Sequence, residues 1–201
     1  MGYSNADWGG DFDDSKSTSG YVFLLNNGTI SWSSKKQTCV ALSTMEAEFV
    51  ACSAAVQEAV WLRYFLDHLG VIGGDIEPVK LYCDSQAAIA YSKDSKYHGR
   101  TKHIRMKYNF VRDMIAQNEI TLQHVSTYEM VADPFTKLIP RDIFREHLRS
   151  LGLHRLSSFM FLFFIYFHVW ILYGFLLVLV INVLFYSMMI VPLHEIHTYT
   201  I

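Results

Sequence analysis

The stretch YVFLLNNGTISWS, residues 21–33, decides the fold of this chain. Aromatic and β-branched residues fill positions 21–25, and apolar and polar residues alternate again over positions 29–33. The Asn-Asn-Gly between them supplies residues that accept the positive φ angles of a tight turn. The stretch therefore predicts a β-hairpin. Because residues 2–8 also predict a strand, we expect the chain to begin with a three-stranded antiparallel meander.

The pattern after the meander indicates strands that alternate with helices. Ser43 begins a predicted helix, Glu46 completes a capping box with it, and Gly70 ends the helix. The further predicted elements are strand 79–83, helix 85–92, helix 103–117, strand 120–124, a helix from Val131, and an amphipathic helix from Pro140 to Leu151. This order predicts an α/β fold with a mixed sheet and flanking helices, in which crossovers follow the meander.

The composition changes abruptly after Arg155. Residues 157–193 contain no Asp, Glu, Lys or Arg, and the apolar stretch 159–181 exceeds the roughly 20 residues that cross a bilayer. We therefore expect a C-terminal transmembrane-like helix, with membrane as a partner and the folded domain on the cytoplasmic side, because basic residues precede the stretch. Alternatively, the apolar segment arises from translation of sequence beyond the normal end of the gene, and we favour this origin.

The same shift in composition divides the chain into segments. The net charge of -2 over 201 residues hides this division, because nearly all charged residues precede the apolar segment. We expect a folded domain at residues 1–139, an amphipathic helix and basic linker at 140–156, the apolar segment at 157–193, and a polar terminus at 194–201.

The cysteines bear on the compartment. Cys39, Cys52 and Cys83 are an odd number without a CxxC spacing, and each lies in or beside an apolar run. Free thiols in a reducing compartment are the simplest interpretation, so we expect the folded domain in the cytoplasm or nucleus. The start of the chain has neither a basic patch nor an apolar stretch, and no secretion signal is expected.

Four positions suggest metal-dependent phosphodiester chemistry: Glu48 on the long helix, Asp84 after a strand, Asp133 at a helix start, and Asn5 on the first strand. Acids at strand ends and on a helix packed against the sheet can meet at one point. Such a set can hold two divalent cations about 4 Å apart, one activating water and one stabilising the leaving oxygen. Mg²⁺ prefers carboxylate oxygen, so acids are the expected ligands.

Helix periodicity selects Glu48 over Glu46. Glu48 shares a face with apolar residues at steps of three and four and points toward the sheet, whereas Glu46 is expected to cap the helix. Asp84 and Asp133 each have a structural alternative, because an aspartate at a helix start is stabilising in its own right. Only the combination of the positions favours the functional interpretation.

Ordered motifs over about three quarters of the chain resemble the ribonuclease H domain at the carboxyl end of Copia-type retrotransposon Pol polyproteins. They lie at residues 2–8, 13–21, 30–37, 43–51, 83–88, 100–104 and 132–137. The resemblance implies a ribonuclease H-like fold with a five-stranded mixed sheet. It also implies Mg²⁺-dependent cleavage of the RNA strand of an RNA–DNA hybrid, with the reverse transcriptase and integrase of the parent polyprotein as partners.

The resemblance places the metal-binding acids at Glu48, Asp84, Asp133 and position 5. The family has aspartate at position 5, where this chain has Asn5. The amide keeps a neutral oxygen but lacks the charge that holds Mg²⁺, so we expect impaired catalysis. Asp7 is a possible substitute because alternate strand residues share a face, although about one strand repeat separates it from Asn5.

Several polar residues within the family motifs are candidate nucleic-acid contacts: Lys35, Lys36, Ser85, Gln86, Arg100, Lys102 and His103. Phosphate contacts from basic residues give affinity without sequence preference, which suits recognition of hybrid shape. The alternative is a solvated lysine-rich surface. His103 and His124 also have imidazoles that titrate near neutral pH, but a structural role is the simpler interpretation.

The sequence is compatible with three functions. The first is a hybrid-specific endonuclease. The second is a catalytically inactive remnant that at most binds nucleic acid, which Asn5 favours. The third is a protein tethered to a membrane by its apolar tail.

Overall fold

The computed structural model describes residues 1–11, 13–71, 77–94 and 102–153. These residues belong to one compact unit, Met1–His154, and the second unit is Arg155–Ile201. The expected transmembrane-like segment 157–193 lies outside the described residues. Among the residues that are described, no helix has the length and apolar character needed to cross a bilayer. This finding corrects the expected fold class, which included a C-terminal transmembrane-like helix.

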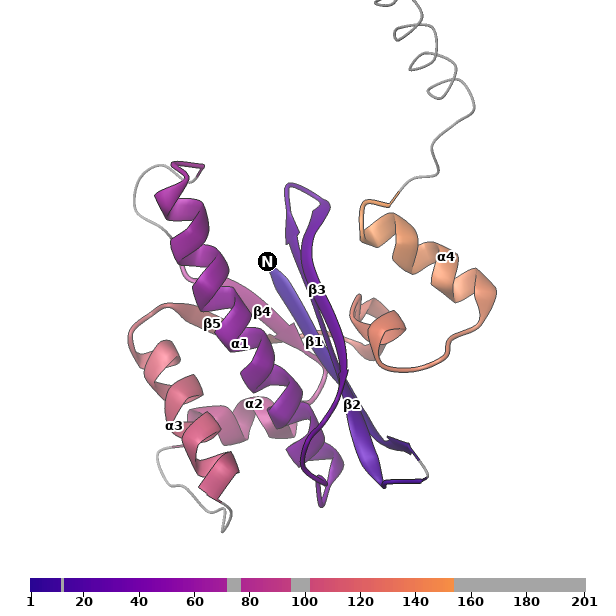
Figure 1. Cartoon of the computed structure of the whole chain (residues 1–201). Helices are drawn as coiled ribbons and strands as arrows, with labels where there is room; N and C mark the ends of the chain where they lie inside the picture. Colours follow the sequence, from indigo (N-terminus) through magenta and orange to yellow (C-terminus); the bar gives the residue numbers. More distant parts are fainter. Residues whose placement is uncertain (12, 72–76, 95–101, 154–201) are drawn as a thin grey trace, which may run out of the picture. The chain divides into compact units, whose positions relative to one another are not determined.

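One mixed sheet forms the centre of the described unit (Figure 1). Its strands are β1 Gly2–Asp11, β2 Lys16–Leu25, β3 Gly28–Lys36, β4 Val79–Cys83 and β5 Ile120–His124. The five strands are ordered β3-β2-β1-β4-β5. The first three pair antiparallel, whereas β4 pairs parallel to both β1 and β5. The expected five-stranded mixed sheet, with its meander first, is confirmed.

The hairpin turn has the backbone that its sequence predicts. Asn26 and Asn27 have φ angles of 49° and 62°, and Leu25 pairs with Gly28 across the turn. Asparagine tolerates this left-handed region better than most residues, because its short side chain can hydrogen-bond locally. The Asn-Asn-Gly sequence therefore sets where β2 ends and β3 begins.

The main helix follows its predicted boundaries closely. Helix α1 is Thr44–His68, and its N-cap Ser43 accepts a hydrogen bond from the Glu46 backbone N–H. Gly70, just beyond the helix, has a φ of 65°. The other helices are α2 Gln86–Lys93, α3 Lys102–Ala116 and α4 Arg141–Ser150, with single turns η1 Thr127–Glu129 and η2 Asp133–Phe135.

The helix expected from Val131 is only the single turn η2. The Asp133 carbonyl accepts the backbone N–H groups of both Thr136 and Lys137, and also the Thr136 hydroxyl at 3.1 Å. A hydroxyl that bonds to a nearby backbone carbonyl competes with continued helix. The prediction of a longer helix here is therefore wrong, although a turn does begin at Asp133.

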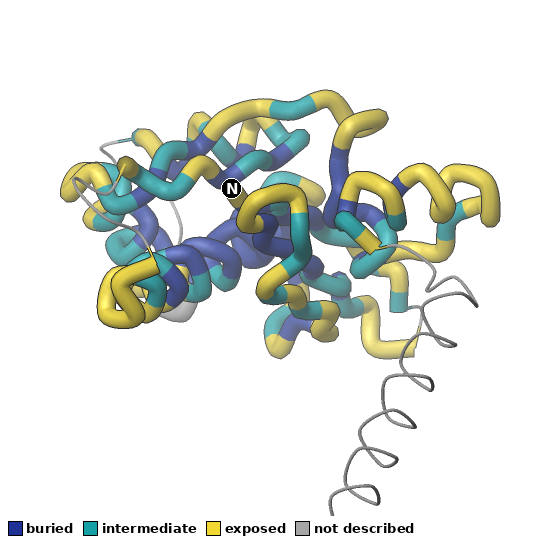
Figure 2. The backbone as a smooth tube through the Cα atoms, turned by 90° about the horizontal axis from the view of Figure 1, so that it is seen from above, coloured by how far each residue is buried: buried dark blue, intermediate teal, exposed yellow. Residues whose placement is uncertain are grey.

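Opposite faces of the sheet bury different clusters, and Figure 2 shows where along the backbone the buried residues lie. On one face α1 packs with α2 and α3 against Phe23 of β2, Leu81 of β4 and Ile120 of β5. On the other, Val22 and Leu24 pack against residues 130–132 and Leu151. Because side chains alternate along β2, one strand supplies both clusters. The segment that carries η2 is thereby held against the face opposite α1.

Gly20 permits the close approach of η2 to the sheet. It pairs with Asn5 across β1 and β2. A Cβ atom on Gly20 would lie 2.7 Å from Thr136 Cγ2 and 2.8 Å from Phe135 Cβ. The missing side chain therefore lets η2 lie beside Asn5.

We expect Gly20→Ala to destabilise the domain by about 1 to 3 kcal/mol, because η2 must shift to relieve these contacts. Gly28→Ala is the matched control, since its Cβ would meet only the Leu25 carbonyl oxygen at 3.6 Å. Urea unfolding of residues 1–153 measures both effects. Equal stability losses in the two variants would contradict this account of Gly20.

Candidate metal centre

Glu48 points from α1 into the interior, as helix periodicity predicts. It is 9% exposed. Its Oε2 atom is buried and makes no hydrogen bond within the described part of the chain. A buried carboxylate oxygen without a donor is costly unless the group is protonated or binds a cation.

The surroundings of Glu48 disfavour its negative charge. Burial and, after it, the nearby charge of Asp84 raise the pKa of the Glu48 carboxyl from 4.5 to about 8. The Ala6 backbone N–H and Lys137 act in the opposite direction, and Asp133 adds a further small rise in this pKa. The charges of both predicted aspartates, Asp84 and Asp133, therefore act on the Glu48 carboxyl.

Glu48, Cys83 and Asp84 form the tightest group of candidate ligands. One ligand atom from each lies within 4.8 Å of the others. Cys83 ends β4 and Asp84 follows in a bend, so the strict alternation of a strand does not separate the two side chains. Burial raises the pKa of the Cys83 thiol. Sequence reasoning missed Cys83 as a ligand because its apolar run indicates core.

Asn5 and Asp133 form the second half of the site. The Asn5 side-chain Nδ2 donates to Asp133 Oδ1 at 2.6 Å and to Thr136 Oγ1 at 3.0 Å. Lys137 Nζ lies 2.9 Å from Asp133 Oδ2. Both carboxylate oxygens of Asp133 thus face nitrogen donors. Thr136 and Lys137 were not predicted as site residues, and their signal in the sequence is that they follow Asp133 by three and four residues within the 132–137 motif.

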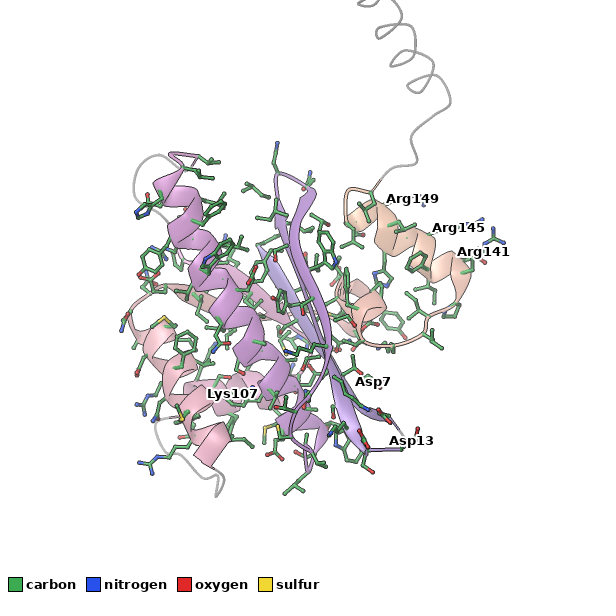
Figure 3. The ribbon with its side chains drawn as sticks, in the orientation of Figure 1. Asp7, Asp13, Lys107, Arg141, Arg145 and Arg149 are labelled. Carbon is green, nitrogen blue, oxygen red and sulfur yellow. The ribbon has the colours of Figure 1, made fainter. Side chains whose placement is uncertain are left out.

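Asp7 does not join this group. A Cβ atom on Gly10 would clash with Asp7 Oδ2, so the Asp7 carboxylate lies over Gly10. The pairing of β1 with β2 shifts register between Asp7 and Asp11, which interrupts the regular alternation of the strand. Figure 3 shows Asp7 at the same end of the sheet as Asp13. Within the described residues no hydrogen bond or ion pair joins Asp7 to the predicted acids, although Asp7 lines one hollow with Thr136 and Lys137.

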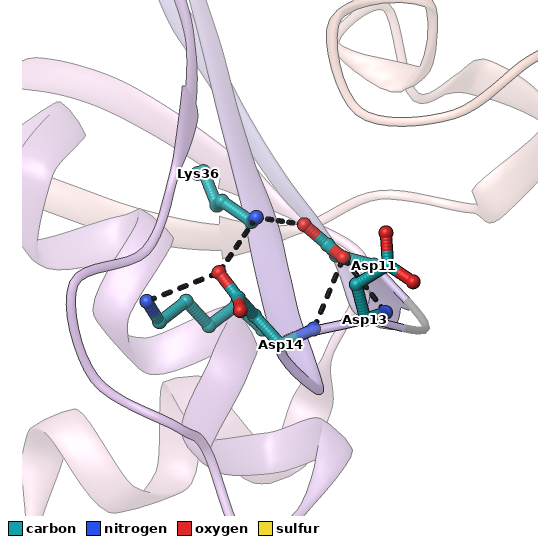
Figure 4. Close-up of polar contacts among 5 residues, drawn as sticks. Asp11, Asp13, Asp14 and Lys36 are labelled. Carbon is teal, nitrogen blue, oxygen red and sulfur yellow. Dashed lines mark hydrogen bonds and ion pairs between the residues drawn. The ribbon is translucent and has the colours of Figure 1, made fainter.

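Two of the predicted nucleic-acid contacts lie on β3. Lys35 is exposed and lines a hollow between the meander and α1. Half-buried Lys107 of α3, labelled in Figure 3, lines the same hollow, and burial lowers its pKa. Lys36 also lines this hollow, but it forms ion pairs with Asp11 and Asp14 (Figure 4). The charge of Lys36 is therefore largely neutralised by its own protein.

The other predicted contacts lie around α2 and α3. Ser85 caps α2 by accepting a hydrogen bond from the Ala88 backbone N–H at 3.2 Å, and exposed Gln86 begins the helix. Lys102 and His103 lie in the first turn of α3, where the structure describes only their backbone, and Arg100 lies outside the described residues.

The ligand atoms of Glu48 and Asp84 fit a divalent cation at one half of the site. Glu48 and Asp84 offer the hard oxygen ligands that Mg²⁺ prefers, and one buried oxygen of Glu48 has no hydrogen-bond partner among the described residues. The Asp133 half fits a cation poorly, since both of its oxygens already face donors from Asn5 and Lys137.

The chain is similar in sequence to Pol polyproteins of plant transposons. It is 44% identical over 153 residues to the retrovirus-related Pol polyprotein from transposon TNT 1-94 of Nicotiana tabacum, covering 76% of this chain and 11% of that protein. It is 38% identical over 150 residues to that from transposon RE2 of Arabidopsis thaliana, covering 75% and 10% respectively. No family model matches the chain.

Among solved structures, the chain is similar to RNase H1 from the halophilic archaeon Halobacterium salinarum NRC-1. The TM-score is 0.46 at 16% sequence identity, over 67% of this chain and 92% of that one.

The fold and the site define an α/β domain with a carboxylate-rich centre suited to a divalent cation. The chain is a homologue of Copia-type retrovirus-related Pol polyproteins, and the resemblance seen in its motifs is confirmed. It spans only 11% and 10% of the length of the two relatives described above.

The raised pKa of Glu48 predicts a pH-dependent stability in metal-free solution. The folded state holds the Glu48 proton up to about pH 8, whereas the unfolded chain releases it near pH 4.5. The folded state therefore binds more protons between these values, and stability falls as the pH rises through that window.

Glu48→Gln removes this contribution. From pH 5 to pH 9 we expect the wild type to lose stability that the variant does not lose. The difference in free energy of unfolding, variant minus wild type, therefore rises by an amount on the order of a few kcal/mol. Urea unfolding in EDTA at several pH values measures the difference, with Glu46→Gln as the control on the same helix. A constant difference across this range would rule out the buried, protonated Glu48.

Proposed function

We propose that this chain is a ribonuclease H domain of a retrotransposon Pol polyprotein, built for Mg²⁺-dependent cleavage of the RNA strand of RNA–DNA hybrids. The observation that carries the proposal is that Glu48 and Asp84, from a helix and a strand end, place ligand atoms within 4.8 Å of each other, while the charge of Asp133, from a turn, adds to the rise in the Glu48 pKa. The homology to Pol polyproteins supports it.

Each side chain has a role in this proposal. Glu48 and Asp84 hold a cation, and Asp133 completes the acidic centre. A bound divalent cation supplies charge stabilisation for phosphodiester hydrolysis. Lys35, on the neighbouring β3, is the described candidate for a phosphate contact, because it is exposed and its charge has no carboxylate partner among the described residues. Lys36 is a weaker candidate because of its ion pairs.

We propose that Asn5 impairs this cleavage activity. A neutral amide at position 5 removes one negative charge from the centre, and its Nδ2 donates to Asp133 instead of leaving that carboxylate for a cation. Loss of charge that holds a metal lowers both affinity and rate.

A second candidate function is a catalytically inactive remnant that binds nucleic acid. The hydrogen bond from Asn5 and the ion pair of Lys137 favour it, because they satisfy Asp133 without any metal. In either case the proposed partners are an RNA–DNA hybrid and the reverse transcriptase and integrase of a parent polyprotein. The three cysteines are free, which suits the proposed place in the cytoplasm or nucleus.

Asn5→Asp tests the two functions against each other. We expect the variant to cleave a labelled RNA–DNA hybrid in Mg²⁺ roughly 10- to 100-fold faster than the wild type, because a carboxylate restores the missing charge. Asn5→Asp combined with Glu48→Gln is the control and is expected to cleave no faster than background.

Equal rates for wild type and Asn5→Asp, both above background, would contradict the account of Asn5. If neither chain cleaves but both bind the hybrid with salt-dependent affinity, the inactive binding protein is the better description.

A further inference from the structure

The two halves of the acidic centre differ in what already satisfies them. At Glu48, Cys83 and Asp84 the ligand atoms lie within 4.8 Å of one another, and the buried Glu48 Oε2 has no hydrogen-bond partner in the described part of the chain. At Asp133 the Asn5 amide and the Lys137 ammonium lie 2.6 Å and 2.9 Å from the two carboxylate oxygens. The first half carries one hydroxyl donor, from Thr127 to Asp84 Oδ2 at 3.1 Å, and keeps the Glu48 oxygen free for a cation, whereas both oxygens of Asp133 carry nitrogen donors.

We infer that this chain binds one divalent cation, at Glu48, Cys83 and Asp84, and that Asn5 and Lys137 together take the place of a second ion at Asp133. The inference rests on the proposed function, since it takes the acidic centre to be a metal site. It departs from the two-ion arrangement expected from the sequence.

The orientation of the Asn5 amide supports this assignment. Its Nδ2 has two acceptors, because Thr136 Oγ1 also donates to the Asp133 carbonyl and so presents a lone pair to Asn5. Turning the amide over would place its oxygen against the Asp133 carboxylate at hydrogen-bond distance, where two acceptors repel. Asn5 is 2% exposed, so water cannot take over either contact. The amide therefore presents a donor, and not a ligand oxygen, to Asp133.

Lys137 adds a fixed positive charge at the same carboxylate. It follows Asp133 by one helical turn and pairs with its second oxygen. A divalent cation at Asp133 must displace this ammonium or accept its repulsion.

Cys83 gives the open half a preference among metals. A thiolate is a softer ligand than a carboxylate, so loss of the Cys83 proton to a bound ion would favour Zn²⁺ over Mg²⁺. Because the Cys83 side chain is fully buried, any ion that it contacts lies at the inner end of the group.

Counting bound Mn²⁺ in the absence of nucleic acid tests the inference. The free ion is followed by electron paramagnetic resonance while Mn²⁺ is added to the full chain. We expect one ion per wild-type chain, two per Asn5→Asp/Lys137→Met chain, and none for Glu48→Gln at the same concentrations. Lys16→Met is the matched control and is expected to bind one ion, because it removes a lysine from an exposed aspartate pair of 3.4 Å elsewhere on the sheet.

The outcomes separate the inference from the proposed function. Two ions in the wild type, or one ion in the Asn5→Asp/Lys137→Met variant, overturn the inference and leave the metal centre standing. No ion in the wild type overturns both. If the double variant does not fold, which circular dichroism shows, the wild-type count alone decides between one ion and two.

Discussion

The parallel pairing of β1 with β4 is the constraint on which the site depends. Gly2 and Tyr3 pair with Leu81 and Tyr82, and the rings of Tyr3 and Tyr82 stack at 5.1 Å. This pairing joins the antiparallel meander to the later part of the sheet. Since parallel strands end at the same edge, it brings Asn5 and Asp84 from distant parts of the sequence into one region. The α1 helix and the η2 turn, on opposite faces, then add Glu48 and Asp133.

The parts of the fold and of the site that could be predicted from the sequence are those that local patterns determine. The hairpin, the N-cap at Ser43 and the burial of Glu48 follow from turn chemistry, capping and helix periodicity, which act over a few residues. The single turn at Asp133 could not be predicted in the same way. It depends on the Thr136 hydroxyl and on the empty space above Gly20, and the second of these exists only when β2 lies under η2.

Cys83 and Lys137 show the limit of reasoning from residue types. An apolar run around a cysteine indicates a buried strand, and this interpretation is right, since Cys83 is fully buried. Its thiol nevertheless lies beside Glu48 and Asp84, because β4 ends at that residue and the chain bends. Lys137 belongs to a motif that draws attention to Asp133, and its own contact depends on the backbone between them. Neither contact has a periodicity that a sequence can display.

Asn5 and Lys137 differ in how firmly they hold Asp133. Lys137 has a side chain that is 37% exposed, so water can solvate its ammonium if it leaves the carboxylate, and an exposed ion pair of this kind contributes little stability. Asn5 has no such alternative, since leaving Asp133 would keep only Thr136 Oγ1 as an acceptor and strand one N–H of a buried amide. The replacement at position 5 therefore removes a charge that a cation needs, and it also stabilises the cation-free site. For that reason the amide, more than the ammonium, sets the difference between the two halves of the centre.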